Sequence, residues 1–191
     1  KHELLAAVGS ADFFNKSAQG QVNGFLAPRS PGSALKPFVY AIGLEKGLIT
    51  PQYYLEDVPV DFSGYCPVNF DRSYNGIISA REALKRSLNV PAINLLAQAG
   101  GHSLYELLRK AHFTTIAEDD HYGLSIVLGG CEVTLLELTT LYSSLANKGI
   151  YVFPKYVLGQ AENMQVQLFK PGVAYIITEI LTEVRRPDLP Y

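Results

Sequence analysis

Ser33 and Lys36 are the residues whose types and spacing point most directly to chemistry. Positions i and i+3 of a helix lie on one face, so a helix here would place the hydroxyl and the amine side by side. Serine is a weak nucleophile until a base takes its proton, and a lysine of lowered pKa can be that base. Desolvation and the positive end of a helix dipole both lower a lysine pKa. The pair therefore indicates acyl transfer at the serine.

The bare Ser-x-x-Lys spacing is a weak signal, because a helix N-cap followed by a solvated lysine has the same sequence. A second pair strengthens it. Ser87 and Asn89 stand between two expected helices, where a hydroxyl and a side-chain amide can be directed into a cleft. The ordinary alternative for Ser-Leu-Asn is a turn, in which both residue types are common.

The element that must position the first pair is a helix from about Ser33 to Lys46. Pro37 falls in its first turn, where a missing N–H costs little, and Gly47 takes the position after its end. Apolar residues recur at helical spacing through this segment, at Leu35, Phe38, Val39 and Ile42.

Capping signals predict the other helices. Ser-x-x-Glu or Thr-x-x-Glu boxes begin at Ser79, Ser103 and Thr134. The helix that starts at Thr134 should end at Gly149. Pro91 is typical of the first position of a helix, here one that Gly100 and Gly101 end. A last helix should run from Pro171 to about Val184.

Strands are predicted where apolar runs are short or alternate with polar residues. Residues 11–32 and 50–78 are rich in turn-forming residues and predict irregular loops. The pattern as a whole indicates one helix-rich α/β domain. The predicted strands are Leu4–Val8, Ile150–Val152, Tyr156–Leu158 and Met164–Leu168.

Composition excludes several classes of function. The chain has 191 residues, 48% of them hydrophobic, and a net charge of −2, which gives no electrostatic basis for binding nucleic acid. Four scattered histidines and two cysteines, Cys66 and Cys131, form no recognisable metal-ligand spacing, so no metal or cofactor is expected. The cysteines could form one disulfide or remain free. No apolar run is long enough to cross a bilayer.

Taken together, several blocks resemble the transpeptidase domain of class A penicillin-binding proteins, over nearly the whole chain. They are Pro31–Phe38, Pro67–Asp71, Arg86–Pro91 and Tyr122–Leu138, which continues to Leu145–Gly149. The resemblance implies a penicillin-binding and serine β-lactamase-like fold, an antiparallel sheet with helices.

The resemblance also implies a role for each site residue. Ser33 would be the nucleophile that a peptidoglycan stem peptide or a β-lactam acylates, and Lys36 the general base. Ser87 would relay a proton between Lys36 and the leaving amine. Asn89 would hold the peptide backbone or the β-lactam side chain. The backbone N–H of Ser33 would be one oxyanion donor, in a protein of the periplasm anchored to the inner membrane.

The chain also departs from the family pattern. The family's third motif, Lys-Ser/Thr-Gly on a downstream strand, does not occur in the sequence. We therefore expect residues 1–191 to be a partial transpeptidase domain without the C-terminal strands, the glycosyltransferase domain and the membrane anchor. Loss of the second oxyanion donor predicts a weak or inactive catalyst when these residues stand alone. An exposed sheet edge would favour self-association.

Other interpretations remain open from the sequence. The same fold could serve as a non-catalytic sensor that β-lactams acylate without turnover. A serine β-lactamase would need a base to activate water, and no Glu-x-x-Leu-Asn segment supplies the class A form of that base. A purely structural role would leave Ser33 unreactive.

Two further groups of residues each have two interpretations. Cys131, after two glycines, is either a thiol of lowered pKa or a packed side chain, and we expect the latter. Six aromatic residues could line a substrate groove, although anchoring of a long loop is the expected role for most of them. They are Tyr53, Tyr54, Phe62, Tyr65, Phe70 and Tyr74.

Overall fold

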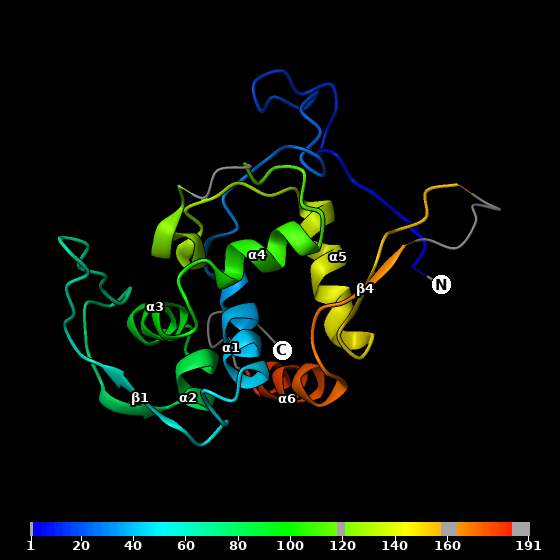
Figure 1. The fold of residues 1–191 in the computed structure, drawn as a ribbon. Helices are drawn as coiled ribbons and strands as arrows, with labels where there is room; N and C mark the ends of the chain where they lie inside the picture. Colours follow the sequence, from blue (N-terminus) through cyan, green and yellow to red (C-terminus); the bar gives the residue numbers. More distant parts are fainter. Residues whose placement is uncertain (1, 118–120, 158–163, 185–191) are drawn as a thin grey trace.

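The computed structural model describes residues 2–117, 121–157 and 164–184, and its helices surround one buried helix (Figure 1). That helix is α1 (Lys36–Glu45), and the 3₁₀ helix η1 (Gly32–Leu35) leads directly into it. The other helices are α2 (Ala80–Lys85), α3 (Asn89–Gln98), α4 (Ser103–Lys110), the 3₁₀ helix η2 (Gly123–Leu128), α5 (Leu135–Ala146) and α6 (Pro171–Thr182).

Helix α1 is the core of the domain. Every side chain from Lys36 to Gly43 is buried, and α1 contacts α2, α3, α4 and α6. A helix that is apolar nearly all round requires neighbours on all sides. Because α1 begins at Lys36, this packing also places a lysine amine inside the domain.

The expected helix at Ser33 is confirmed, with a tighter first turn than predicted. Ser33 lies in the 3₁₀ turn η1, and the α-helix starts at Lys36. Pro37 stands in the first turn of α1 as expected. Gly47 has φ +69°, the left-handed conformation that glycine adopts at low cost after a helix end.

The predicted caps differ in outcome. Thr134 forms a complete capping box, since its hydroxyl accepts the N–H of Glu137 and the Glu137 carboxylate accepts the N–H of Thr134. Ser79 accepts the N–H of Glu82. The box predicted at Ser103 is wrong. Ser103 is the first residue inside α4, and its hydroxyl instead donates to the carbonyl oxygen of Ala99 at 2.6 Å.

The start predicted for α3 is also wrong by two residues. Pro91 is the third residue of α3 and not the first. The helix begins at Asn89 because the side-chain oxygen of Asn69 accepts the N–H groups of Asn89 and Val90. A contact from a distant loop therefore starts this helix.

The strands form two small antiparallel pairs. Strand β1 (Tyr54–Asp57) pairs with β2 (Gly76–Ser79), so residues 50–78 are not wholly irregular as predicted. Strand β3 (Ile150–Val152) pairs with β4 (Gln165–Gln167), which confirms the strands expected there.

Two other predicted strands are wrong. Residues 4–8 form no strand, and Leu5 is 88% exposed. Next to them, the described residues form a single bridge, between Glu3 and Lys155. Tyr156 and Val157 are not in a strand, and Leu158 lies outside the described residues.

Among the described residues, no helix is both long and apolar enough to traverse a bilayer.

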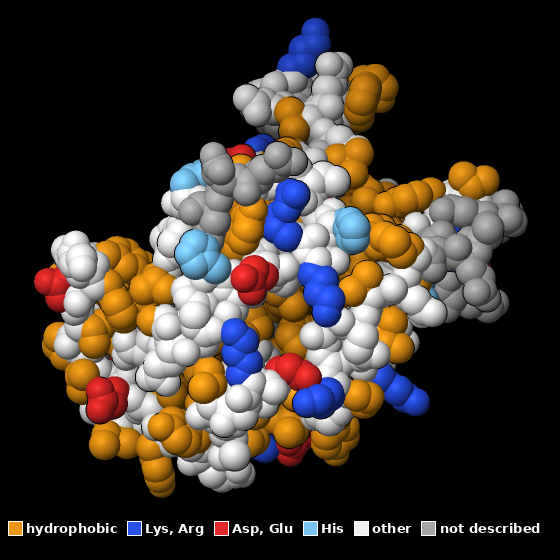
Figure 2. Space-filling model, in the orientation of Figure 1, with side chains coloured by type: hydrophobic (Ala, Val, Ile, Leu, Met, Phe, Trp, Pro, Cys, Tyr) orange, Lys and Arg blue, Asp and Glu red, His pale blue; other side chains and the backbone are white. Residues whose placement is uncertain are grey.

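The aromatic residues of the β1–β2 hairpin and its loop are mostly exposed. Only Phe62 packs against the core, so the anchoring role expected for most of them is wrong. Figure 2 shows hydrophobic side chains on the surface over this part of the molecule. Five aromatics are exposed: Tyr53, Tyr54, Tyr65, Phe70 and Tyr74.

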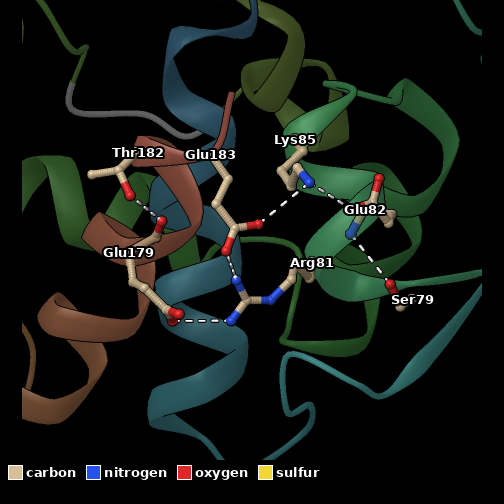
Figure 3. Close-up of polar contacts among 7 residues, drawn as sticks. All are labelled: Ser79, Arg81, Glu82, Lys85, Glu179, Thr182 and Glu183. Carbon is tan, nitrogen blue, oxygen red and sulfur yellow. Dashed lines mark hydrogen bonds and ion pairs between the residues drawn. The ribbon is translucent and has the colours of Figure 1, made fainter. Parts of the chain in front are cut away.

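A group of charged side chains ties α6 to α2 (Figure 3). Arg81 forms ion pairs with Glu179 and Glu183, the first at 2.9 Å, and Lys85 forms ion pairs with Glu82 at 2.8 Å and Glu183 at 3.3 Å. Like charges at i and i+4 repel within each helix. The ion pairs between α2 and the end of α6 offset this repulsion only when the two helices lie together.

We expect Arg81→Met to loosen α6 slightly. The methionine keeps most of the apolar stem and removes the charge that pairs with Glu179 and Glu183. Backbone amides of α6 should exchange with deuterium about 2- to 5-fold faster in the variant. High salt should reduce the difference. The control is Lys16→Met, which removes an exposed lysine from the N-terminal segment. Equal exchange in both variants would contradict the prediction.

Candidate active site

Lys36 stands at the centre of the candidate site. Its side chain is buried, 1% exposed, although lysine is among the residues least often found inside proteins. The ammonium donates to the side-chain oxygen of Asn89 at 2.6 Å, to the Ser87 hydroxyl at 3.2 Å and to the Ser87 carbonyl oxygen. These three bonds use all three N–H donors of the ammonium.

Burial lowers the pKa of Lys36 to about 8, because desolvation disfavours the charged form. The lysine is therefore partly neutral at a pH where an exposed lysine is fully protonated. A lysine with a lowered pKa is suited to accept a proton, and desolvation is one of the two causes, with the helix dipole, that the sequence predicted.

Ser33 lies one turn before Lys36 and is exposed. Its hydroxyl forms no hydrogen bond with any described residue, and Lys36 donates to Ser87 and Asn89 instead. Ser33 is in the first turn of η1, where backbone N–H groups have no intrahelical acceptor. Its N–H is thus free to donate to an oxyanion.

The structure brings Ser87 and Asn89 to Lys36, although more than fifty residues separate them in the chain. Ser87 has φ +54°, a left-handed conformation that a residue with a Cβ adopts only at some cost. The strained turn directs both the hydroxyl and the carbonyl oxygen of Ser87 to the ammonium. Local sequence could suggest the turn, but it could not show where the turn points.

Asn69 and Asp57 support the site from behind. Asn69 is 2% exposed and Asp57 is 0% exposed, and the Asn69 amide donates to the Asp57 carboxylate at 2.7 Å. The side-chain oxygen of Asn69 accepts the N–H of Asn89 at 2.8 Å. Asn69 lies in one of the blocks that carry the family resemblance, whereas nothing in the sequence singled out Asp57.

A glycine holds η1 in place. Gly129 has φ +90°, and a Cβ there would lie 2.5 Å from the backbone nitrogen of Gly32, so only glycine allows this approach. The hydroxyl of Ser30 donates to the carbonyl oxygen of Gly129 at 2.8 Å. On the other side, the Tyr142 hydroxyl donates to the carbonyl oxygen of Ala34 at 2.8 Å.

The cysteines take no part in this site. Both are free thiols, with Cys66 exposed and Cys131 buried. Burial raises the pKa of Cys131 to about 11, so the expected packed side chain is confirmed. Within the described ranges, no group of three or more His, Cys, Asp or Glu side chains could hold a metal ion.

The fold described above is that of a penicillin-binding protein transpeptidase domain. Residues 1–188 match the family of the penicillin-binding protein transpeptidase domain, and the chain belongs to that family.

Individual relatives agree with this assignment. The chain is 36% identical over 185 residues to penicillin-binding protein 1C of Escherichia coli (strain K12), covering 94% of this chain and 23% of the relative. It is 34% identical over 206 residues to penicillin-binding protein 1A of Neisseria meningitidis, covering 96% of this chain and 25% of the relative. The chain thus spans about a quarter of the length of these curated relatives.

A solved structure shares the fold. The PonA1 protein from Mycobacterium tuberculosis in complex with penicillin V matches with a TM-score of 0.71 and 24% sequence identity, over 83% of this chain and 48% of that chain. This similarity confirms the expected helix-rich α/β architecture.

We expect Lys36 to titrate near pH 8 in the folded protein. Its reaction with a trace of acetic anhydride, followed by mass spectrometry of the peptide that contains it, should have its midpoint close to 8. The amine is the reactive form, so reactivity rises with pH through the pKa. In urea the burial is lost and the midpoint should return to the ordinary lysine value of about 10.4. A midpoint above 10 in the folded protein would contradict the assignment.

Proposed function

We propose that this chain carries the acylation site of a serine D,D-transpeptidase that cross-links peptidoglycan stem peptides and that β-lactams acylate. The observation that carries the proposal is the contact of a buried lysine amine of lowered pKa with Ser87 and Asn89, one helical turn from an exposed serine. The family membership supports the same reaction class.

In the proposed first step, Ser33 Oγ attacks the carbonyl carbon of the terminal D-Ala-D-Ala bond while the neutral Lys36 amine takes the hydroxyl proton. To do so, Lys36 turns its lone pair from the Ser87–Asn89 side toward Ser33. The C–N bond then breaks, and the leaving amine receives a proton from Lys36 through the Ser87 hydroxyl. An acceptor amine later attacks the acyl-enzyme and gives up a proton to Lys36. The new amide forms as the ester bond to Ser33 breaks, and Lys36 returns the proton to Ser33 Oγ.

Two features would stabilise the charge that develops. The N–H of Ser33 would donate to the oxyanion, and the N-terminal end of η1 and α1 favours negative charge at this position. Asn89 would hold the peptide backbone or the β-lactam side chain. A β-lactam would follow the first step but keep its leaving amine tethered, so its acyl-enzyme should persist. We place the reaction in the periplasm, in a protein anchored to the inner membrane.

The first prediction is that a fluorescent penicillin adds once to the full-length protein that carries this chain, and that Ser33→Ala abolishes the adduct. The matched control is Ser63→Ala, which removes an exposed hydroxyl from the loop between β1 and β2. Intact-mass spectrometry measures both. A folded protein that forms no adduct, or an adduct that survives Ser33→Ala, would contradict the site.

Turnover assays then distinguish the remaining functions. Cross-linking of stem peptides supports a transpeptidase, and labelling without cross-linking supports a sensor. Rapid hydrolysis of nitrocefin would favour a β-lactamase. Residues 1–191 should label slowly, because they contain no Lys-Ser/Thr-Gly motif to supply the second oxyanion donor.

The second prediction concerns pH. If neutral Lys36 is the base, the acylation rate should rise with pH and level off above about 8, following the pKa of the amine. Below pH 7 the rate should fall about tenfold for each unit, because only the neutral fraction reacts. Stopped-flow labelling from pH 6 to 10 measures this. A rate independent of pH across this range would contradict the role of Lys36 as base.

A further inference from the structure

Asn69 occupies a position from which it controls Asn89. Its side-chain oxygen accepts the N–H of Asn89 at 2.8 Å and the N–H of Val90 at 3.3 Å. Its side-chain nitrogen donates to the carboxylate of Asp57 at 2.7 Å and to the carbonyl oxygen of Ser73 at 2.9 Å. An asparagine amide has two acceptor and two donor positions, so all four are in use and the amide has one orientation.

The same contact replaces a missing helix cap. The residue before α3 is Leu88, whose side chain cannot accept a hydrogen bond, and α3 has no side-chain cap of its own. The first N–H groups of a helix require acceptors from outside the helix. Asn69 supplies one from the loop between β1 and β2, and so fixes the backbone from which the Asn89 side chain projects.

The neighbouring residue fixes the Asn89 side chain. Asn89 Nδ2 donates to the carbonyl oxygen of Val68 at 2.7 Å, which leaves its Oδ1 directed at Lys36 Nζ. Val68 and Asn69 therefore hold Asn89 by side chain and by backbone together. The position of the Lys36 amine depends on both contacts.

Asp57 anchors this arrangement in the core. Its carboxylate is fully buried and accepts hydrogen bonds from Asn69 and from the backbone and side-chain nitrogens of Asn75. No lysine or arginine of the described residues forms an ion pair with it. A buried carboxylate without a counter-ion is stable only when hydrogen-bond donors surround it. Loss of the Asn69 amide nitrogen would leave one oxygen of Asp57 without its donor.

We propose that the buried Asp57–Asn69 pair is a positioning device for the active site, which holds Asn89 and, through it, the Lys36 amine in the geometry for acylation. This inference rests on the proposed function. It assigns a purpose to the β1–β2 hairpin: β1 ends at Asp57, and the loop that follows delivers Asn69 to α3.

The test is an exchange of the two side chains in the full-length protein. Asn69→Asp alone places two carboxylates together, and Asp57→Asn alone exchanges the anchoring carboxylate for an uncharged amide. In the double variant the pair is complementary again. The amide oxygen at position 57 can accept from Asn75, and its nitrogen can donate to the carboxylate at position 69. That carboxylate still accepts the N–H groups of Asn89 and Val90, at a helix end that favours negative charge.

We expect each single variant to lower the rate constant for acylation by a saturating fluorescent penicillin about 10- to 100-fold. A small displacement of catalytic groups has an effect of this size. The double variant should recover part of the rate, because the pair is restored but the carboxylate at position 69 cannot donate to the Ser73 carbonyl oxygen. Arg72→Ala, which removes an exposed side chain from the same loop, is the control and should label like the wild type. Single variants that label at the wild-type rate, or a double variant no better than the singles, would overturn the proposal.

A second measurement keeps this inference separate from the proposed function. The Lys36 titration midpoint, read by trace acetylation, should move from about 8 toward the ordinary lysine value in the single variants, because water reaches the amine. It should return in the double variant. If the wild type fails to label but the midpoint moves and returns, the proposed function fails and the positioning device stands. An unchanged midpoint in folded single variants would overturn the device.

Discussion

The removal of one lysine amine from water is the constraint on which the rest of this structure depends. Lys36 begins a helix that is buried almost throughout, so the packing of α1 carries a charge into the interior. Burial of a charge is unfavourable unless hydrogen bonds compensate it. The domain supplies three hydrogen-bond acceptors for the ammonium from a single turn. These bonds do not fully offset the cost of desolvation, so the pKa of the lysine stays lowered.

The acceptors themselves need support. The Ser87–Asn89 turn has a left-handed residue, and a turn of this kind keeps its shape only when its surroundings determine it. Asn69 provides this at the start of α3, and Asp57 holds Asn69 in turn. The site is thus built in layers. Outward from the amine come a strained turn, then a buried amide, and then a buried carboxylate at the end of a short strand.

The nucleophile is under a different constraint. Ser33 is exposed, while the segment around it is held by close contacts from Gly129 and Tyr142. A reacting side chain must be open to a substrate, but its backbone must not move. The 3₁₀ turn η1 satisfies both conditions, since its backbone leads directly into the buried helix and its side chain at Ser33 projects outward. The ion pairs between α2 and α6 close the opposite side of the same core.

The amino-acid sequence by itself determined the helices and the residue types of the site. Periodicity and end signals placed the α1 segment, α5 with its capping box and α6, because these depend on neighbours in the chain. The spacing of Ser33 and Lys36 and the Ser87–Asn89 pair could also be found by local reasoning. Some local signals were misleading because the tertiary structure leaves them unused. The Ser103 hydroxyl turns to Ala99, and the apolar residues 4–8 lack a neighbouring strand.

Only the tertiary structure decided how those residues meet. Helix α3 begins two residues early because Asn69 reaches it from another loop, and Asp57 is important only because folding buries it beside that asparagine. The lysine pKa follows from the same cause, since desolvation depends on everything that packs around α1 and on no local pattern. Sequence spacing specifies which groups can react. Long-range packing fixes their distances, their solvation and therefore their protonation.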